Sequence, residues 1–251
     1  MTTTSGSTSP PSPRCSACSL SQFCLPVGIP LDELSRLDQL VAERIRLKKG
    51  EALYLYGDPL RAIFGVRFGS LKSYIDSEDG REQVVGLHIQ GELLGLDAIA
   101  DERHASTAVA LEDSEVCVVR FAELEKLSAQ VPSLQRQLHR LLSLEIRNDH
   151  RMLLSLGTMR AEQRLAVFLL NLSERLSMRG YAANEFVLRM SREEIGSYLG
   201  LTLETVSRLF SRLQQSGVLS IKQRRLTVTD PDALRQLAGE NCQAPAISRA
   251  R

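Results

Sequence analysis

Short β-prone runs alternate with glycines between Gly50 and Arg120, and this pattern constrains the fold more than any other feature of the sequence. Runs that recur every 8–12 residues or so, with turn signals between them, favour an antiparallel barrel or sandwich. The sequence therefore predicts an antiparallel, jelly-roll-like β-roll here. The expected strands are 52–56, 63–68, 71–75, 83–87 and Glu115–Arg120, and the turn glycines are Gly50, Gly57, Gly69, Gly80 and Gly91.

Leucines recur at helical spacing on both sides of this region. A short amphipathic helix is expected over residues 31–45, which contain Leu31, Leu34, Leu37, Leu40 and Val41. A helix farther along the chain should end near Gly180, because a glycine often follows the last turn. Its apolar face is formed by Leu165, Phe168, Leu169, Leu172 and Leu176.

A longer helical pattern starts at Pro132, a residue that suits the first turn of a helix, and meets no glycine before Gly157. Apolar steps of three and four along it are typical of a coiled coil. It has more apolar positions than one contact face needs, which favours a dimer, while a helix packed wholly on its own β-roll is the alternative. The expected dimer interface is Leu138, Leu142, Ile146, Asp149 and Leu153.

Two short helices joined by a glycine turn are expected between Ser191 and Gly217. Ser191 and Glu194 have the spacing of a capping box, the first helix breaks at Gly200, and the second begins at Leu203. Such a pair is the signal of a helix-turn-helix. The positions expected to face inward are Ile195, Leu199, Leu201, Val206, Leu209 and Leu213.

The outward positions of the second helix carry groups that can read a DNA major groove. Arg208 can donate two hydrogen bonds to guanine, Glu204 can accept one from cytosine, and Ser207 is small and adaptable. All three lie in the N-terminal part of the helix, where recognition helices reach base edges. Thr205 and Ser211 also face outward. An ordinary helical hairpin with a solvated charged face is the alternative.

A basic stretch follows this second helix. Two β-prone runs, 218–221 and 226–229, flank Lys222-Gln223-Arg224-Arg225 and predict a hairpin wing. We expect phosphate contacts, which fix register without reading sequence, from Arg212, Lys222, Arg224 and Arg225.

Charge is divided unevenly along the chain. Residues 160–251 contain 14 Lys and Arg against 9 Asp and Glu, a net charge of +5, whereas residues 1–159 contain 17 against 21, a net charge of −4. This asymmetry indicates that the C-terminal part meets an anion. No run approaches the roughly 18 apolar residues of a membrane span, and the first residues do not form a cleavable leader. The expected location is the cytoplasm.

Three of the five cysteines, Cys15, Cys18 and Cys24, lie within ten residues of one another, while Cys117 and Cys242 are remote. An odd number of cysteines in a cytoplasmic chain does not indicate a disulfide framework. A chance cluster of buried residues is one alternative. A four-thiolate site is another, and it would hold an iron–sulfur cluster or zinc, or act as bare thiols. Zinc usually takes two close pairs, so the triplet plus one remote cysteine fits a cluster better.

Taken together, these features resemble the FNR (fumarate and nitrate reduction regulator) branch of the CRP/FNR superfamily of bacterial transcription regulators. The similarity covers roughly residues 15–240 and is carried by the order of elements, the cysteine spacing and the stretch from Gly200 to Arg208. The resemblance implies a [4Fe–4S] cluster whose loss to oxygen dissociates a DNA-binding dimer. The ligands that it implies are Cys15, Cys18, Cys24 and Cys117.

The resemblance also implies partners. These are double-stranded DNA with inverted repeats close to TTGAT and ATCAA, read by Glu204, Ser207 and Arg208, and RNA polymerase, contacted by loops such as 76–81. Relatives that bind cyclic nucleotides have a Gly-Glu pair for the ribose and an Arg-Ser or Arg-Thr pair for the phosphate. Here Gly95-Leu96-Asp97 and His104-Ala105-Ser106 stand in those stretches, so no cyclic nucleotide is expected.

An iron–sulfur electron-transfer protein or redox enzyme is the rival class. The helix-turn-helix argues against it, and so does the lack of a Gly-rich nucleotide loop or a Ser/His/Asp constellation, so no enzymatic activity is expected. The predicted fold class is α+β: a β-roll, a long dimerisation helix and a winged helix-turn-helix. The expected division is a disordered tail (1–14), a cluster-binding segment (15–30), a sensor domain (31–130), the dimerisation helix (131–157), the DNA-binding domain (158–240) and a second disordered tail (241–251).

Overall fold

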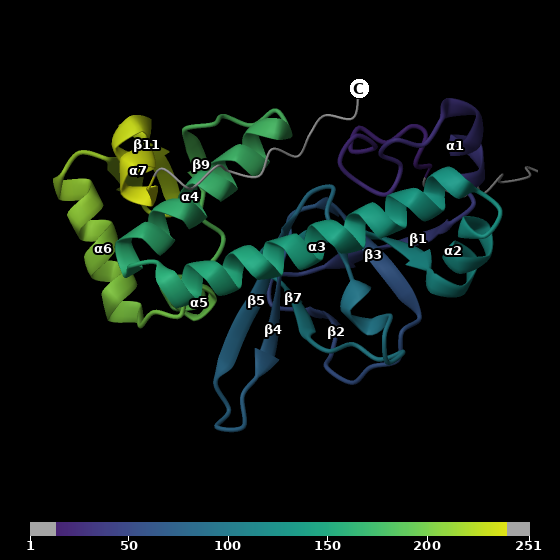
Figure 1. Cartoon of the computed structure of the whole chain (residues 1–251), viewed down its shortest axis with the longest axis horizontal. Helices are drawn as coiled ribbons and strands as arrows, with labels where there is room; N and C mark the ends of the chain where they lie inside the picture. Colours follow the sequence, from purple (N-terminus) through teal and green to yellow (C-terminus); the bar gives the residue numbers. More distant parts are fainter. Residues whose placement is uncertain (1–13, 240–251) are drawn as a thin grey trace, which may run out of the picture.

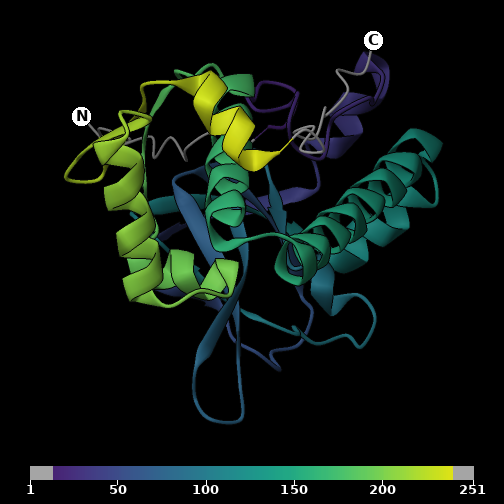
Figure 2. The same cartoon turned by 60° about the vertical axis from the view of Figure 1, so that its left-hand side comes forward.

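The computed structural model describes residues 14–239 (Figures 1 and 2). A β-roll lies at one end and a mostly helical domain with a small sheet at the other, and the long helix α3 (Pro132–Thr158) runs along both (Figure 1). The α+β fold class predicted from the sequence is confirmed. Cys242 and the two predicted tails, 1–14 and 241–251, lie outside the described residues, apart from Arg14.

Two antiparallel four-stranded sheets form the β-roll. Its strands are β1 (Val41–Leu47), β2 (Ala52–Tyr54), β3 (Ala62–Phe68), β4 (Ser70–Asp76), β5 (Glu82–Ile89), β6 (Leu93–Leu94), β7 (Thr107–Ala110) and β8 (Ser114–Arg120). One sheet has the order β1-β8-β3-β6 and the other β2-β7-β4-β5. Between them lies an apolar core that includes Val66, Leu71 and Val116. All five expected strands are present, within a residue or two at most ends.

The helix expected over residues 31–45 is wrong in its second half. Helix α1 is only Leu31–Leu37, and Val41–Leu47 is strand β1, which pairs with β8 in the register Ile45 to Val116. The leucine spacing matched a helix, but the backbone groups of Val41–Leu47 bond to β8, so sheet pairing overrides the local pattern. Leu31 is 87% exposed, so it is not part of the expected apolar face.

Helix α3 follows the short helix α2 (Phe121–Ser128) and has Pro132 in its first turn. It contains 27 residues, which corresponds to about 40 Å at 1.5 Å per residue. Only Ser133, Leu134, Gln137 and Ser155 of this helix are buried. Most of its length therefore has a face that its own chain leaves uncovered.

The C-terminal domain packs three helices and a small sheet around α4 (Ala161–Met178). Leu165 and Leu169 of α4 are fully buried. Strands β10 (Leu219–Lys222) and β11 (Arg225–Val228) form the expected hairpin, and β9 (Glu185–Val187) adds a third strand to it. Helix α7 (Pro231–Ala238) closes the domain against α4. None of the described helices has the length and apolarity needed to cross a membrane.

The C-terminal domain is docked on β5. Helix α5 (Arg192–Leu199) lies against this strand, where Ser197 Oγ accepts from the Val84 N–H at 2.7 Å and donates to the Glu82 carbonyl at 2.7 Å. Lys72 Nζ on β4 bridges Glu82 and Glu194, at 2.8 and 3.1 Å. One cluster of buried apolar residues extends from β5 into α4, α5 and α6 (Leu203–Gln215). The two domains therefore share one core.

The hairpin between β3 and β4 requires a glycine at position 69. Gly69 has φ +83°, and a Cβ there would lie 2.8 Å from the Cα of Ser114. Gly80 has φ +77° with nothing near its missing Cβ, which makes it a matched control. Gly80→Ala should cost about 1–2 kcal/mol of unfolding free energy, from backbone strain alone. Gly69→Ala should cost about 1–3 kcal/mol more, because the backbone of Ser114 must move.

Denaturant unfolding of the two variants beside the parent protein measures both costs. Equal losses in Gly69→Ala and Gly80→Ala would contradict the assigned close approach.

Candidate DNA-binding surface and cysteine site

Helix α5 and helix α6 (Leu203–Gln215) form the expected helix-turn-helix. The capping box is present: Ser191 Oγ accepts from the Glu194 N–H at 3.1 Å, and Glu194 accepts from the Ser191 N–H at 2.7 Å. Gly200 ends α5 in the left-handed conformation, with φ +62°. Two features of the turn had no signal in the sequence. A Cβ on Gly196 would lie 2.7 Å from the Leu201 carbonyl oxygen, and Arg164 Nη1 donates to the Leu199 carbonyl at 2.7 Å.

Helix α6 separates an apolar face from a polar one. Thr202 caps its N-terminus by accepting from the Thr205 N–H at 3.2 Å. Of the six positions expected to face inward, five are buried and Leu201 is half-buried. Phe210, which sequence analysis did not select, is buried too, with the Arg192 guanidinium 3.3 Å from its ring centroid.

The base-reading candidates are on the exposed face. Glu204, Ser207 and Arg208 are all exposed on α6. Arg208 Nη2 donates to Thr205 Oγ1 at 3.4 Å. A hydrogen bond from its own backbone N–H lowers the pKa of Glu204, so this carboxylate is ionised at neutral pH. Exposed side chains that together offer donors and acceptors have the chemistry needed to engage base edges.

The basic side chains expected to bind phosphate differ in the contacts that they make within the chain. Lys222 is exposed at the tip of the wing, and Arg224 donates to the Arg189 carbonyl at 3.2 Å. Arg212 lies 3.9 Å from a Glu162 carboxylate oxygen, and Arg225 is paired with Glu185. Exposed ion pairs of this kind contribute little to stability, so each arginine can exchange its carboxylate partner for a phosphate.

Residues Cys15–Ile29, here called the cysteine segment, form consecutive turns over the β1-β8-β3-β6 sheet of the β-roll. The N–H groups of Cys18 and Cys24 donate to the Cys15 and Leu20 carbonyls, both at 3.1 Å. The carboxylate of Asp38, at the end of α1, accepts from the Ser16 N–H at 2.8 Å and from its hydroxyl at 2.6 Å. Sequence analysis did not select Asp38, because a single carboxylate carries no local signal of this contact.

The four predicted ligands line one cavity. Cys15, Cys18 and Cys24 face it from the cysteine segment, and Cys117 faces it from β8. A Cβ on Gly65 of β3 would lie 3.2 Å from the Cys24 sulfur, so the sheet leaves room there. The remaining walls are mainly apolar, with arginines at the margin; they include Leu20, Leu25, Val41, Leu93, Arg14, Arg44 and Arg67.

Burial controls the protonation of Cys15, Cys24 and Cys117. It raises the pKa of Cys15 and of Cys24 to about 12. Burial also raises the pKa of Cys117, although the Arg44 guanidinium opposes the shift. Without a bound metal these groups are neutral thiols at pH 7, and ligation is what would convert them to thiolates.

The sulfurs surround the cavity without meeting at one point. Within residues 14–239, no three His, Cys, Asp or Glu side chains lie close enough to hold one metal ion. A structural zinc site gathers its four ligands around one ion. An iron–sulfur cluster is larger and binds each thiolate at a separate iron.

The expected dimer seam is uncovered along its central part. Ile146 is 55% and Leu153 67% exposed, Asp149 is exposed between them, and Leu138 and Leu142 are half-buried. Leu138 packs against the core under the cysteine segment. The first part of the seam therefore packs against the β-roll, whereas its later residues are exposed to solvent.

Comparison with known proteins places this arrangement in a family. A family model for a Crp-like helix-turn-helix domain matches residues 163–237, and one for a cyclic nucleotide-binding domain matches residues 44–131. The fumarate and nitrate reduction regulatory protein of Escherichia coli K12 is 45% identical over 226 residues, which cover 90% of each chain. The chain belongs to the FNR branch of the CRP/FNR family.

Other relatives agree with this placement. The transcriptional regulatory protein btr of Bordetella pertussis is 54% identical over 235 residues, 93% of this chain and 97% of that protein. The solved structure of FixK2 from Bradyrhizobium japonicum superimposes with a TM-score of 0.74 at 34% identity, covering 79% of this chain and 98% of that one. The chain is thus a DNA-binding transcription regulator of the CRP/FNR family.

Proposed function

We propose that this regulator senses oxygen through a [4Fe–4S] cluster bound by Cys15, Cys18, Cys24 and Cys117. With the cluster it dimerises and binds an inverted-repeat operator at low oxygen. The observation that carries the proposal is the shared cavity, in which three cysteines from one short segment face a fourth on β8. When bound, such a cluster supplies an oxygen-labile link between the four thiolates.

The same cavity supports the choice of cluster over the alternatives. Three cysteines from one short segment and a fourth from β8 differ from the two close pairs that structural zinc usually takes. A bare thiol switch would need reactive thiolates, whereas burial keeps the pKa of Cys15 and Cys24 high. The exposed α6 in turn supports a regulator over an electron-transfer protein.

We assign DNA contacts by position on the winged helix-turn-helix. Glu204, Ser207 and Arg208 read base edges, and Arg212, Lys222 and Arg224 bind phosphates. A two-fold dimer presents two such surfaces, so the operator is an inverted repeat. The dimer forms along Leu138, Leu142, Ile146, Asp149 and Leu153. The exposed residues 76–81, at the turn from β4 to β5, are offered to RNA polymerase.

The domain division expected from the sequence, with boundaries at 15, 31, 131 and 158, is part of this proposal.

We also propose that no cyclic nucleotide binds. The two stretches that would meet it are engaged with each other: Asp97 accepts from the Ala105 N–H at 3.0 Å and from Ser106 Oγ at 2.8 Å. His104 is 3% exposed and stacks on Tyr54, with ring centroids 3.7 Å apart. Neither a free carboxylate for a ribose nor an arginine for a phosphate remains there.

The ligand assignment predicts which cysteines hold iron. Replacing Cys15, Cys18, Cys24 or Cys117 by Ala should abolish the cluster, because each thiolate completes the coordination of one iron. Cys242→Ala should keep it and is the matched control. Iron, sulfide and visible absorbance are measured in protein prepared without air. Full cluster content in Cys117→Ala, or a colourless zinc-containing parent protein, would contradict the assignment.

The DNA contacts predict two different mutant phenotypes. Arg208→Ala should cost about 1–3 kcal/mol of DNA-binding free energy, because a bidentate contact to guanine is lost. It should also relax the base preference at one base pair of each half-site. Lys222→Ala should weaken binding to all DNA sequences alike, because one phosphate contact is lost. It should also reduce by about one the slope of the logarithm of the binding constant against the logarithm of the salt concentration. Titrations against a series of single-base operator variants separate the two. Unchanged base preference in Arg208→Ala would show that another residue reads this position.

The seam predicts that Asp149 weakens the dimer. An isologous contact brings Asp149 close to its symmetry mate, and two buried like charges repel. Asp149→Ala should therefore dimerise in air, where the parent protein is monomeric. Sedimentation of both proteins tests this, with Asn148→Ala as a control on the neighbouring exposed position. A variant as monomeric as the parent would place Asp149 outside the interface.

A further inference from the structure

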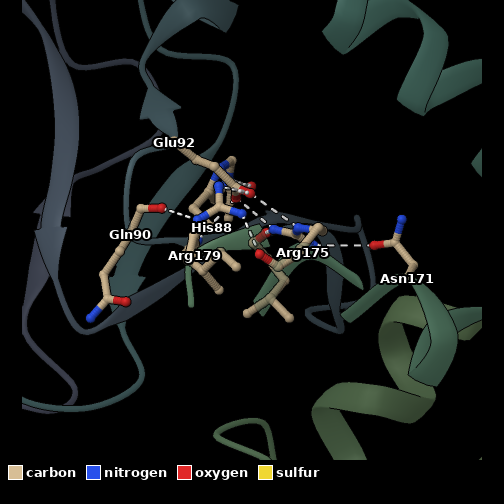
Figure 3. A network of polar contacts seen from close by, with 9 residues as sticks. His88, Gln90, Glu92, Asn171, Arg175 and Arg179 are labelled. Atoms are coloured by element: carbon tan, nitrogen blue, oxygen red, sulfur yellow. Dashed lines mark hydrogen bonds and ion pairs between the residues drawn. The ribbon is translucent and has the colours of Figure 1, made fainter. Parts of the chain in front are cut away.

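A buried ion-pair network joins the β-roll to the first helix of the DNA-binding domain (Figure 3). Glu92 lies in the turn between β5 and β6, and Arg175 and Arg179 come from α4. Arg175 Nη2 is 2.5 Å and Arg179 Nη2 2.9 Å from the two carboxylate oxygens of Glu92. Arg179 also donates to the Gln90 and Arg175 carbonyls, and Arg175 donates to the Leu87 carbonyl at 2.5 Å.

This network is held away from solvent. The side chain of Arg179 is only 3% exposed, and those of Arg175 and Glu92 are also largely covered. Burial alone would raise the pKa of Glu92, but the two arginines lower it below its usual value, so the carboxylate stays ionised. Two guanidinium groups against one carboxylate leave one cation in excess, and a buried excess cation needs another partner.

Phe23 of the cysteine segment provides that partner. The Arg179 guanidinium carbon lies 5.1 Å from the centroid of the Phe23 ring, within the range of a cation–π contact. The Cβ of Phe23 also rests on Gly91, where an added Cβ would lie 2.6 Å away. Phe23 is therefore held between the β5–β6 turn and α4.

Phe23 is also bonded directly to Cys24, so it moves with one of the four cavity-lining cysteines. We infer that Phe23 and Arg179 are positioning residues, whose contact sets the placement of the DNA-binding domain according to the state of the cysteine segment. This inference rests on the proposed function only in that ligation of the cysteines sets that state. The contact is made within one chain and does not pass through the dimer seam on α3.

The test is a set of substitutions that separates the contribution of the aromatic ring face of Phe23 from that of its apolar packing. Phe23→Leu keeps an apolar side chain but removes the ring face, whereas Phe23→Tyr keeps the ring. Gln22→Ala, at the exposed neighbouring position, is the matched control. For each protein, purified without air, operator affinity, dimer fraction by sedimentation, and iron and sulfide content are measured.

We expect Phe23→Leu to retain iron, sulfide and the dimer but to bind the operator about threefold to tenfold more weakly, the range that a partly desolvated cation–π contact implies. Phe23→Tyr and Gln22→Ala should bind like the parent protein. Amide hydrogen exchange should be faster in the last turn of α4 of Phe23→Leu than in the controls, without DNA present.

A double-mutant cycle completes the test. Arg179→Met removes the cation while Arg175 continues to pair with Glu92, and adding Phe23→Leu to it should weaken DNA binding no further. Additive losses, or parent-like affinity in Phe23→Leu, would overturn the inference. Loss of iron together with affinity in Phe23→Leu would overturn it too, since Phe23 would then act on the cluster. An iron-free parent protein would instead count against the proposed function.

Discussion

The presentation of helix α6 depends on the apolar core that crosses from the β-roll into the DNA-binding domain. Val84, Leu87 and Ile89 of β5 are buried in one cluster with the interior residues of α4, α5 and α6. Burial of apolar surface is worth about 25 cal/mol per Å², so several large side chains outweigh any single polar contact at this junction. Domains joined by a large apolar interface do not rotate freely. The polar contacts of Ser197 and Lys72 also hold α5 on the β-roll, within the range of orientations that the core permits.

The cysteine segment is held in a different way. Its turns from Cys15 to Cys24 rest on short-range backbone hydrogen bonds and on the Asp38 carboxylate, and the four cavity-lining cysteines are only half-buried. Residues 15–24 of the segment are exposed or half-buried, and a stretch with few buried contacts opens at a low free-energy cost. On the proposed function, ligand bonds to iron supply most of the order in this part of the chain, because metal binding and local folding are coupled. The sensor thus combines a weakly held segment with a strongly held DNA-binding domain.

Local signals explain why the helix-turn-helix was predictable in detail. The capping box of Ser191 and Glu194 and the left-handed Gly200 are decided by neighbouring residues, and both appear where the sequence placed them. Strand β1 was mistaken for helix because its pairing with β8 joins residues about 70 positions apart, which no local spacing reveals. The same holds for Asp38, Phe210 and the Glu92 network. Cysteine spacing singled out three residues and the family resemblance implied Cys117 as the fourth ligand, but only the fold shows that all four face one cavity.

The cysteine segment reaches the rest of the molecule along two routes. Leu25 and Ile29 pack with Val131 and Leu134 at the start of α3, and the Ser133 hydroxyl donates to Glu33 of α1. On the other side, Phe23 contacts Arg179 of α4. The first route ends on the helix that carries the proposed dimer seam, and the second on the domain that carries α6. A change in the cysteine segment can therefore bias assembly and domain placement together. Operator binding by a two-fold dimer needs both assembly and correct domain placement. Modest shifts in these two equilibria therefore multiply in the operator affinity and give a steeper response than either shift alone.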